Sequence, residues 1–272
     1  MDDDAGAAAA ARSRRLVQPE QGKDLSMSFD TFDFRARTLP MIVVWFPAIL
    51  TAAVIAAGYP AVHRLGTLLP LPLTFVLTVL AAHIARDAGK KIEASLWDAW
   101  GGPPATARLR WASAQNPVLH QDLHTNIQAI VGAQLQLPTK EEELADPVHA
   151  DHVYETVVRT LIARTTSKDD YAKLKNDLIW YSFRRNLYGL RRFAYWVDAL
   201  LIIASIAAVV VLIRTSLDFS LTAPVIGFLA AAMSVIFFSC TVTAEWVRLS
   251  AEAYADELIK YVYVAPSGTG PI

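Results

Sequence analysis

Long apolar runs are the strongest feature in the pattern of hydrophobic and polar positions along this chain. Four of them cover residues 39–59, 65–85, 195–213 and 221–244. Each is close to the roughly 20 residues that an α-helix needs to cross a bilayer. Buried core helices are the alternative, but four such runs in two closely spaced pairs favour membrane spans. The pattern predicts a polytopic membrane protein with a lipid bilayer around two transmembrane helical hairpins, residues 39–85 and 195–244.

Basic residues lie on one side of these predicted hairpins. The two short links hold few of them, whereas the outer flanks carry Arg35, Arg37, Arg86, Lys90, Lys91, Arg184, Arg185, Arg191, Arg192 and Arg248. Cytoplasmic flanks of membrane helices are enriched in Lys and Arg, so both termini and the segment 86–194 are expected to be cytoplasmic. The first residues run from acidic through alanine-rich to basic. That order is the reverse of a signal peptide, and residues 1–38 are expected to form a cytoplasmic tail.

The segment 86–194 has helical rather than strand periodicity. A helix over 86–100 is expected to leave the membrane and to end at Gly101-Gly102-Pro103-Pro104, because glycine accepts left-handed geometry and proline cannot continue a helix. Later helices are expected over 118–134, from an acidic first turn at 141–143 to about 164, and from a cap at 167–170 toward the third apolar run. Residues 245–272 predict an amphipathic helix that continues the fourth run, then a short tail. The whole chain is therefore predicted to be all-α.

Composition agrees with a membrane protein and excludes several kinds of binding and catalytic site. The chain has 272 residues, of which 54% are hydrophobic, and its formal net charge is −1. Cys240 is the single cysteine, which excludes an internal disulfide and a zinc-ribbon spacing. No glycine-rich phosphate loop, nucleophile elbow or dinucleotide fingerprint occurs in the sequence. We therefore expect neither an enzyme, nor catalytic residues, nor a cofactor.

Two pairs of histidines have spacings that can place two imidazoles on one metal ion. His120 and His124 are four residues apart, and His149 and His152 are three apart. The sequence offers neither a suitably placed glutamate nor a cysteine to complete such a site. Histidines at the surface or at an interface are favoured, and no metal site is predicted.

Basic residues distant from the apolar runs are candidates for binding an anionic ligand. Arg108 and Arg110 follow the Gly-Pro turn, and Arg159 and Arg164 lie on a later predicted helix. Guanidinium groups bind phosphate through charge-assisted hydrogen bonds, and ion pairs between helices are the equal alternative. For the arginines at 184–192, membrane topology and anionic lipid head groups are the favoured explanation.

The fourth apolar run contains hydroxyl side chains that could line a path through the membrane. On one continuous helix Ser234, Thr241 and Glu245 share a face, so symmetric assembly would stack rings of hydroxyls below a ring of carboxylates. Small and hydroxyl residues also permit close packing of membrane helices. That packing is the alternative function of the same residues.

The order of two spans, a helical cytosolic module and two more spans resembles the four-span membrane effectors of bacterial nucleotide-signalled antiviral defence. The segments RDAGKKIEASLWDAWGGPPATARLRW and RRNLYGLRR also resemble a bacterial family encoded beside nucleotidyltransferases. Among named families, the chain resembles the Hailong-type defence channels. The resemblance implies the bacterial inner membrane and a nucleotide or oligonucleotide signal from a partner nucleotidyltransferase. It assigns no binding residue.

Two functions follow as hypotheses. The first is a homo-oligomeric channel or pore in antiphage defence, gated by a nucleotide-type signal that its cytosolic helices sense. The second is a non-conducting membrane scaffold whose segment 86–194 recruits a cytosolic partner. A transporter is less favoured, because the two predicted hairpins differ too much to form an inverted repeat.

Overall fold

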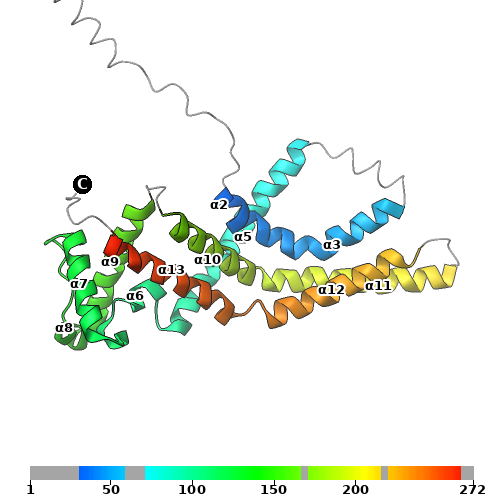
Figure 1. Ribbon diagram of the computed structural model, residues 1–272. Helices are drawn as coiled ribbons and strands as arrows, with labels where there is room; N and C mark the ends of the chain where they lie inside the picture. The colour runs from blue at the N-terminus through cyan, green and yellow to red at the C-terminus, as the bar shows by residue number, and fades with distance from the viewer. Residues whose placement is uncertain (1–30, 59–70, 167–170, 216–219, 265–272) are drawn as a thin grey trace, which may run out of the picture. The chain divides into compact units, whose positions relative to one another are not determined.

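The computed structural model describes residues 31–58, 71–166, 171–215 and 220–264 (Figure 1). Most of the predicted N-terminal tail, the first link with the start of the second apolar run, the predicted cap at 167–170 and the last residues lie outside these ranges. Within them every regular element is helical, which confirms the all-α prediction. The elements are α2 (Thr31–Asp33), the π-helix η1 (Phe34–Thr38), α3 (Leu39–Gly58), α5 (Leu71–Trp100), α6 (Pro104–Ala107), the 3-10 helix η2 (Trp111–Ser113), α7 (Pro117–Val131), α8 (Lys140–Ala145), α9 (Pro147–Thr166), α10 (Ala172–Gly189), α11 (Arg191–Thr215), α12 (Thr222–Cys240) and α13 (Ala244–Val264).

Three of the described helices are long and apolar enough to cross a membrane. They are the continuous helix Phe34–Gly58, α11 and α12. Between 17% and 28% of the residues in their apolar windows are buried within the chain. Most of their apolar surface therefore faces outward, as lipid contact requires. By length and composition, these helices indicate that the chain associates with a membrane.

The helix α5 begins inside the predicted second span and runs on through the predicted exit helix. It ends at Trp100, where Gly101 and Gly102 have φ angles of +81° and +120°. The N–H of Gly102 donates to the carbonyl of Trp97 over 2.8 Å. The Gly-Gly-Pro-Pro sequence thus ends the helix as predicted, because L-residues with side chains rarely adopt these angles.

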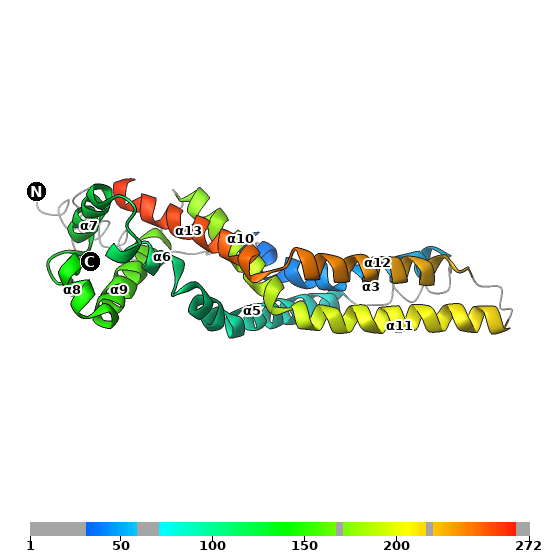
Figure 2. The ribbon, with the colours of Figure 1, turned by 90° about the horizontal axis from the view of Figure 1, so that it is seen from below.

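The helices α11 and α12 pack along one another, and α12 also packs against α3 (Figures 1 and 2). Small and hydroxyl side chains lie where α12 contacts α11 and α3. A Cβ atom on Gly227 of α12 would approach the hydroxyl oxygens of Ser205 and Thr51 to 2.9 Å. Glycine at this position therefore permits the close approach of α12 to both neighbours.

A second close crossing joins α5 to α10. A Cβ atom on Gly189 would lie 2.5 Å from the carbonyl oxygen of Ala88, and one on Gly89 would overlap the side chain of Asn186. The buried amide of Asn186 donates to the carbonyl of Ala36 in η1 over 2.8 Å. Two glycines and one asparagine thus hold three segments together where they converge beside the candidate spans.

The break between α12 and α13 corrects one prediction. We expected one helix from the fourth apolar run into the carboxy-terminal segment, but α12 ends at Cys240 and α13 begins at Ala244. Val242 is fully buried between them, and the hydroxyl of Thr243 accepts the N–H of Trp246 over 3.2 Å. The burial of Val242 and the cap from Thr243 offset the loss of the backbone hydrogen bonds that a continuous helix would make.

The module between the spans has a core of its own, to which α13 contributes. Its fully buried side chains come from α7, α9 and α13 and from the turn after α6. They include Leu109, Ile127, Tyr154, Val157, Leu161 and Leu258. Residues between Ala105 and Leu174 therefore share one helical core with the second half of α13.

Candidate functional site

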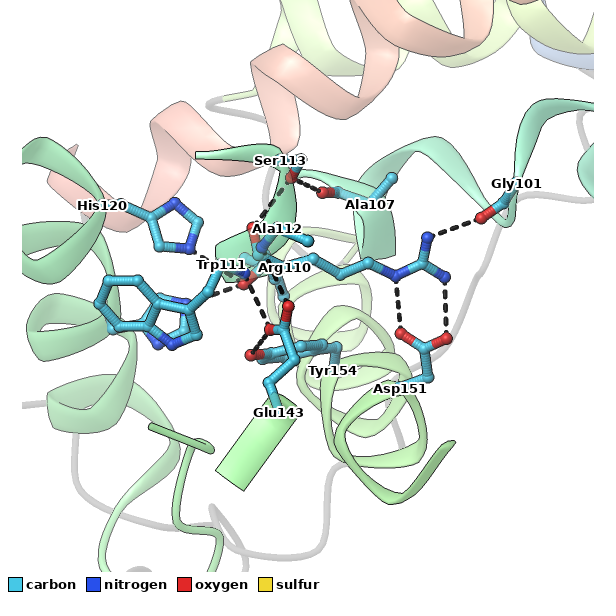
Figure 3. A network of polar contacts seen from close by, with 12 residues as sticks. Gly101, Ala107, Arg110, Trp111, Ala112, Ser113, His120, Glu143, Asp151 and Tyr154 are labelled. Atoms are coloured by element: carbon cyan, nitrogen blue, oxygen red, sulfur yellow. Dashed lines mark hydrogen bonds and ion pairs between the residues drawn. The ribbon is translucent and has the colours of Figure 1, made fainter. Parts of the chain in front are cut away.

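A polar network lies at the turn between α6 and η2 (Figure 3). Arg110 donates from Nε and Nη2 to the two carboxylate oxygens of Asp151 in α9, over 2.7 and 2.8 Å. Its Nη1 donates to the carbonyl of Gly101 over 2.6 Å. The carboxylate is held by two parallel hydrogen bonds, and the carbonyl takes the third nitrogen of the guanidinium. It connects the end of α5 to α9.

Arg108 forms a similar pair with the carboxy-terminal helix. Its Nε and Nη2 donate to the two oxygens of Asp256 over 2.6 and 3.3 Å. The pair joins α6 to α13 and is about half exposed. An anionic ligand at either Arg108 or Arg110 has to compete with a carboxylate that already occupies the guanidinium.

The other two candidate arginines lie elsewhere on α9. Arg159 is 81% exposed and reaches Glu155 at 3.7 Å, while Arg164 is half-buried near the carboxy end of the helix. Thirteen residues separate Asp151 from Arg164, which is about 20 Å along a helix. The structure thus pairs Arg108 and Arg110 with separate carboxylates and places Arg164 far from the Arg110 pair.

Glu143 is the centre of the network, and sequence analysis did not single it out. It is 8% exposed and accepts the N–H groups of Trp111 over 2.8 Å and Ala112 over 3.0 Å. It also accepts the hydroxyl of Tyr154 over 2.7 Å, and burial together with this carboxylate raises the pKa of Tyr154. Three consecutive glutamates at 141–143 are equivalent in sequence, so no local signal could have selected the third.

The histidines of α7 correct another prediction. His120 and His124 are 7% and 5% exposed, not at the surface. In both imidazoles Nε2 is within hydrogen-bonding distance of the carbonyl oxygen of Leu109. The distance is 3.1 Å for His120 and 2.9 Å for His124. Burial lowers the pKa of each imidazole, which favours the neutral form. One shared carbonyl acceptor explains why two histidines can be buried side by side.

His149 and His152 on α9 are exposed, as predicted. Among the residues that the structure describes, no three histidine, cysteine, aspartate or glutamate side chains are grouped closely enough to hold a metal ion.

An open groove of about 600 Å³ runs beside the two buried histidines, between α7 and the start of α8. Its wall includes Trp111, Gln121, His124, Thr125 and Lys140. The indole of Trp111 is fixed, because its Nε1 donates to the carbonyl of Pro138 over 3.0 Å. The wall has an aromatic ring, polar side chains and a lysine that can contact a planar, phosphate-bearing ligand, and Glu141 next to that lysine is its one acidic side chain.

Inside the candidate spans, Asp198 of α11 is fully buried. Ser234 of α12 lies against this carboxyl group, but neither oxygen of Asp198 makes a hydrogen bond of normal geometry within the described residues. A buried ionisable side chain with so little hydrogen bonding is costly in a membrane, which makes Asp198 a candidate functional residue. Ser234 thus faces a neighbouring helix within the chain.

The break after α12 separates the remaining pore candidates from Ser234. Thr241 lies in the break and Glu245 lies in the first turn of α13, and both are exposed. The three residues therefore do not share one face of a single helix.

Comparisons of this chain with models of protein families, with curated proteins and with solved structures found no match.

Proposed function

We propose that this chain is a signal-gated membrane effector, in which the helical module controls an oligomeric channel or pore formed by the spans. The course of α13 carries the proposal. Val247 and Ala251 in its first half pack with α5 and α10, and Leu258 and Tyr261 in its second half belong to the module core. One helix therefore connects the candidate sensor to the last candidate span.

Movement of the module would reach the membrane through this helix. Only three residues separate α12 from α13, and the middle one, Val242, is fully buried beside the spans. Arg184 donates to the carbonyl of Trp246 over 3.0 Å, which attaches the first turn of α13 to α10. A rigid helix with packed ends transmits a displacement, whereas a flexible linker would absorb it.

The groove beside Trp111 is the proposed place for the signal. A nucleobase can stack on an indole, and Lys140 at the rim can pair with a phosphate. The resemblance to nucleotide-signalled defence effectors supports a nucleotide or oligonucleotide from a partner nucleotidyltransferase. Arg159 and Arg164 remain candidates for further phosphates, while Arg108 and Arg110 have to exchange carboxylate partners to take part.

The membrane part is proposed to have four spans, with the second at residues 65–85 leading into α5. The basic flanks support a cytoplasmic location for both termini, and the resemblance to bacterial defence effectors supports the bacterial inner membrane. In a homo-oligomer, Asp198 with Ser234 would form one polar level and Glu245 a second, at the cytoplasmic mouth. Acidic rings at these levels would favour cations.

Recordings from the purified full chain in planar bilayers test this function. Cyclic and linear di- and trinucleotides should change the current, and Lys140→Gln should reduce that response while the oligomer stays intact. Lys175→Gln is the matched control, because Lys175 is an exposed lysine of α10 outside the groove wall. Glu245→Gln should lower the preference for cations. A chain that carries no current with any of these nucleotides contradicts the channel.

The scaffold is the second candidate, and exposed apolar side chains on the module favour it. Val118 is 80% exposed, Leu144 is 73% exposed and Val148 is 65% exposed. Such side chains are common in protein interfaces. Loss of a cytosolic partner in Leu144→Ser and Val148→Ser variants, with no current in the unchanged chain, would favour the scaffold.

A further inference from the structure

A groove of about 840 Å³ lies where α5 passes the junction of α10 with α11. Lys91 of α5 lines it, together with Arg191 and Arg192 from the first turn of α11. Asp87 is the single acidic side chain in its wall, so the groove is positive. Its apolar wall is formed mainly by Ile84, Ala88, Ile92, Leu96, Ala99 and Tyr188.

The basic residues of this groove differ from their neighbours in how they are paired. Arg185 forms an ion pair with Glu93, and Arg184 lies over the ring of Trp246. Lys91 and Arg192, in contrast, are exposed and form no ion pair within the described ranges. Two cationic groups are therefore free to bind an anion.

Arg191 is held in place but not neutralised. Its guanidinium carbon lies 5.4 Å from the ring centre of Tyr188 and 5.8 Å from that of Tyr195. Its Nη1 makes a long contact of 3.4 Å with the carbonyl of Val242. Aromatic rings and a carbonyl orient the charge and leave it without a carboxylate in the described part of the chain.

The position of the groove indicates which anion it meets. Arg191 is the first residue of a candidate span, so the groove opens at the level where that helix enters the membrane. Ile84 lies seven residues before Lys91 on α5, about 10 Å along the helix axis, and falls inside the predicted second span, residues 65–85. Ile84 is 47% exposed and could contact an acyl chain, while the three cations could contact a phosphate.

We propose that this groove binds one anionic glycerophospholipid of the surrounding bilayer. The phosphodiester lies between Lys91 and Arg192, with Arg191 behind it, and an acyl chain lies along Ile84 and Ile92. Basic pockets between membrane helices bind anionic head groups by the same combination of charge and apolar contact. Because α5, α10 and α11 all line the groove, the bound lipid would brace the junction between the spans and the module.

Native mass spectrometry of the full chain tests this site. The chain is extracted from vesicles of phosphatidylcholine with or without phosphatidylglycerol, and the retained lipid is identified. The unchanged chain should retain phosphatidylglycerol in preference to phosphatidylcholine. Lys91→Gln and Arg192→Gln should each lower that preference by about fivefold, the ratio expected when one cationic contact near a head group is lost.

Two further variants separate binding from folding. Lys175→Gln removes an exposed lysine of α10 that lies outside the groove wall and has no ion pair within the described residues, and it should leave lipid retention unchanged. Asp87→Asn removes the acid from the groove and should increase phosphatidylglycerol retention, a gain that misfolding cannot produce. Equal retention by the unchanged chain and the Lys91→Gln and Arg192→Gln variants, or a decrease with Asp87→Asn, would overturn the proposal.

A competition arm distinguishes lipid from a soluble phosphate compound. Glycerophosphoglycerol carries the same phosphodiester without acyl chains, and it should not displace the lipid at equal concentration. Displacement by this head group alone would assign the groove to a soluble ligand and overturn the lipid. The outcome is independent of channel activity, since retention is measured without nucleotide or current.

Discussion

Arg110, in the turn between α6 and η2, faces Asp151 of α9, and both carboxylate oxygens are hydrogen-bonded to the guanidinium. The residues are 41 positions apart in the chain, and their side chains are 24% and 36% exposed. This pair joins the turn after α6 to the first turns of α9, and the bond from Nη1 to the carbonyl of Gly101 adds the end of α5. It also makes the proposed ligand-binding role of Arg110 separable from a structural one.

Arg110→Gln and Asp151→Asn should each destabilise the full chain by about 1 kcal/mol, since the pair is partly exposed. The double variant should lose little more than either single one, because both remove the same interaction. Unfolding in detergent measures this. If Arg110 also binds a phosphate, nucleotide affinity falls in Arg110→Gln but not in Asp151→Asn. Equal affinity in both would leave Arg110 with the structural role alone.

Glu143→Gln should destabilise the module by about 1–3 kcal/mol, because one carboxylate accepts two backbone N–H groups and the Tyr154 hydroxyl. Glutamine keeps the shape but offers only one acceptor oxygen. Thermal unfolding followed by tryptophan fluorescence measures the loss. Glu141→Gln is the control, since Glu141 is exposed two positions earlier. Equal unfolding temperatures for the two variants would contradict the stabilising role of Glu143.

The stability of the module should fall as the pH drops below about 6.5. Burial lowers the pKa of His120 and His124 in the folded chain, so the unfolded chain binds protons first as the pH falls. The stabilising contribution of the neutral imidazoles is complete above the histidine pKa of the unfolded chain. It is lost as the pH falls to the lower pKa values of the folded chain. Replacing both residues with glutamine should flatten this dependence in unfolding experiments between pH 5 and pH 8. His152→Gln, an exposed control, should not.

Asp198→Leu should stabilise the detergent-solubilised chain by on the order of 1 kcal/mol, because it removes a buried carboxyl group without hydrogen bonds of normal geometry. The same change should abolish or alter the proposed current. Ser205→Ala, elsewhere on α11, serves as the comparison. A variant that is less stable than the unchanged chain would mean that Asp198 makes favourable contacts, for example with a second copy.

The four-span topology predicts which positions are accessible from outside the cell. After Cys240→Ser removes the single native thiol, His63→Cys and Asp218→Cys should react with an impermeant maleimide on intact cells. Lys140→Cys should react only after the cells are opened. External labelling at position 140 would contradict the orientation and place the module in the wrong compartment.

Local sequence patterns were sufficient for most of the helices and for some of their ends. Apolar runs, Gly101-Gly102-Pro103 and Pro117 act within a few residues, so these helices and breaks can be read without the rest of the chain. The start of α7 at Pro117 and the end of α5 at Trp100 follow from these signals, whereas the single helix expected from 141 to about 164 is divided at Asp146 into α8 and α9. The exposure of His149 and His152 was also predicted correctly.

Contacts between distant segments required the tertiary structure. The carboxylate of Asp256 that meets Arg108 lies 148 residues away, and no local pattern selects it among the acidic residues. The burial of His120 and His124 depends on the Leu109 carbonyl, which the turn after α6 places between them. The break after Cys240 depends on burying Val242 against the spans. Sequence therefore determined where the helices and the apolar surfaces lie, because those follow from neighbouring residues. Only the docking of helices decided which polar groups are paired and which are left free.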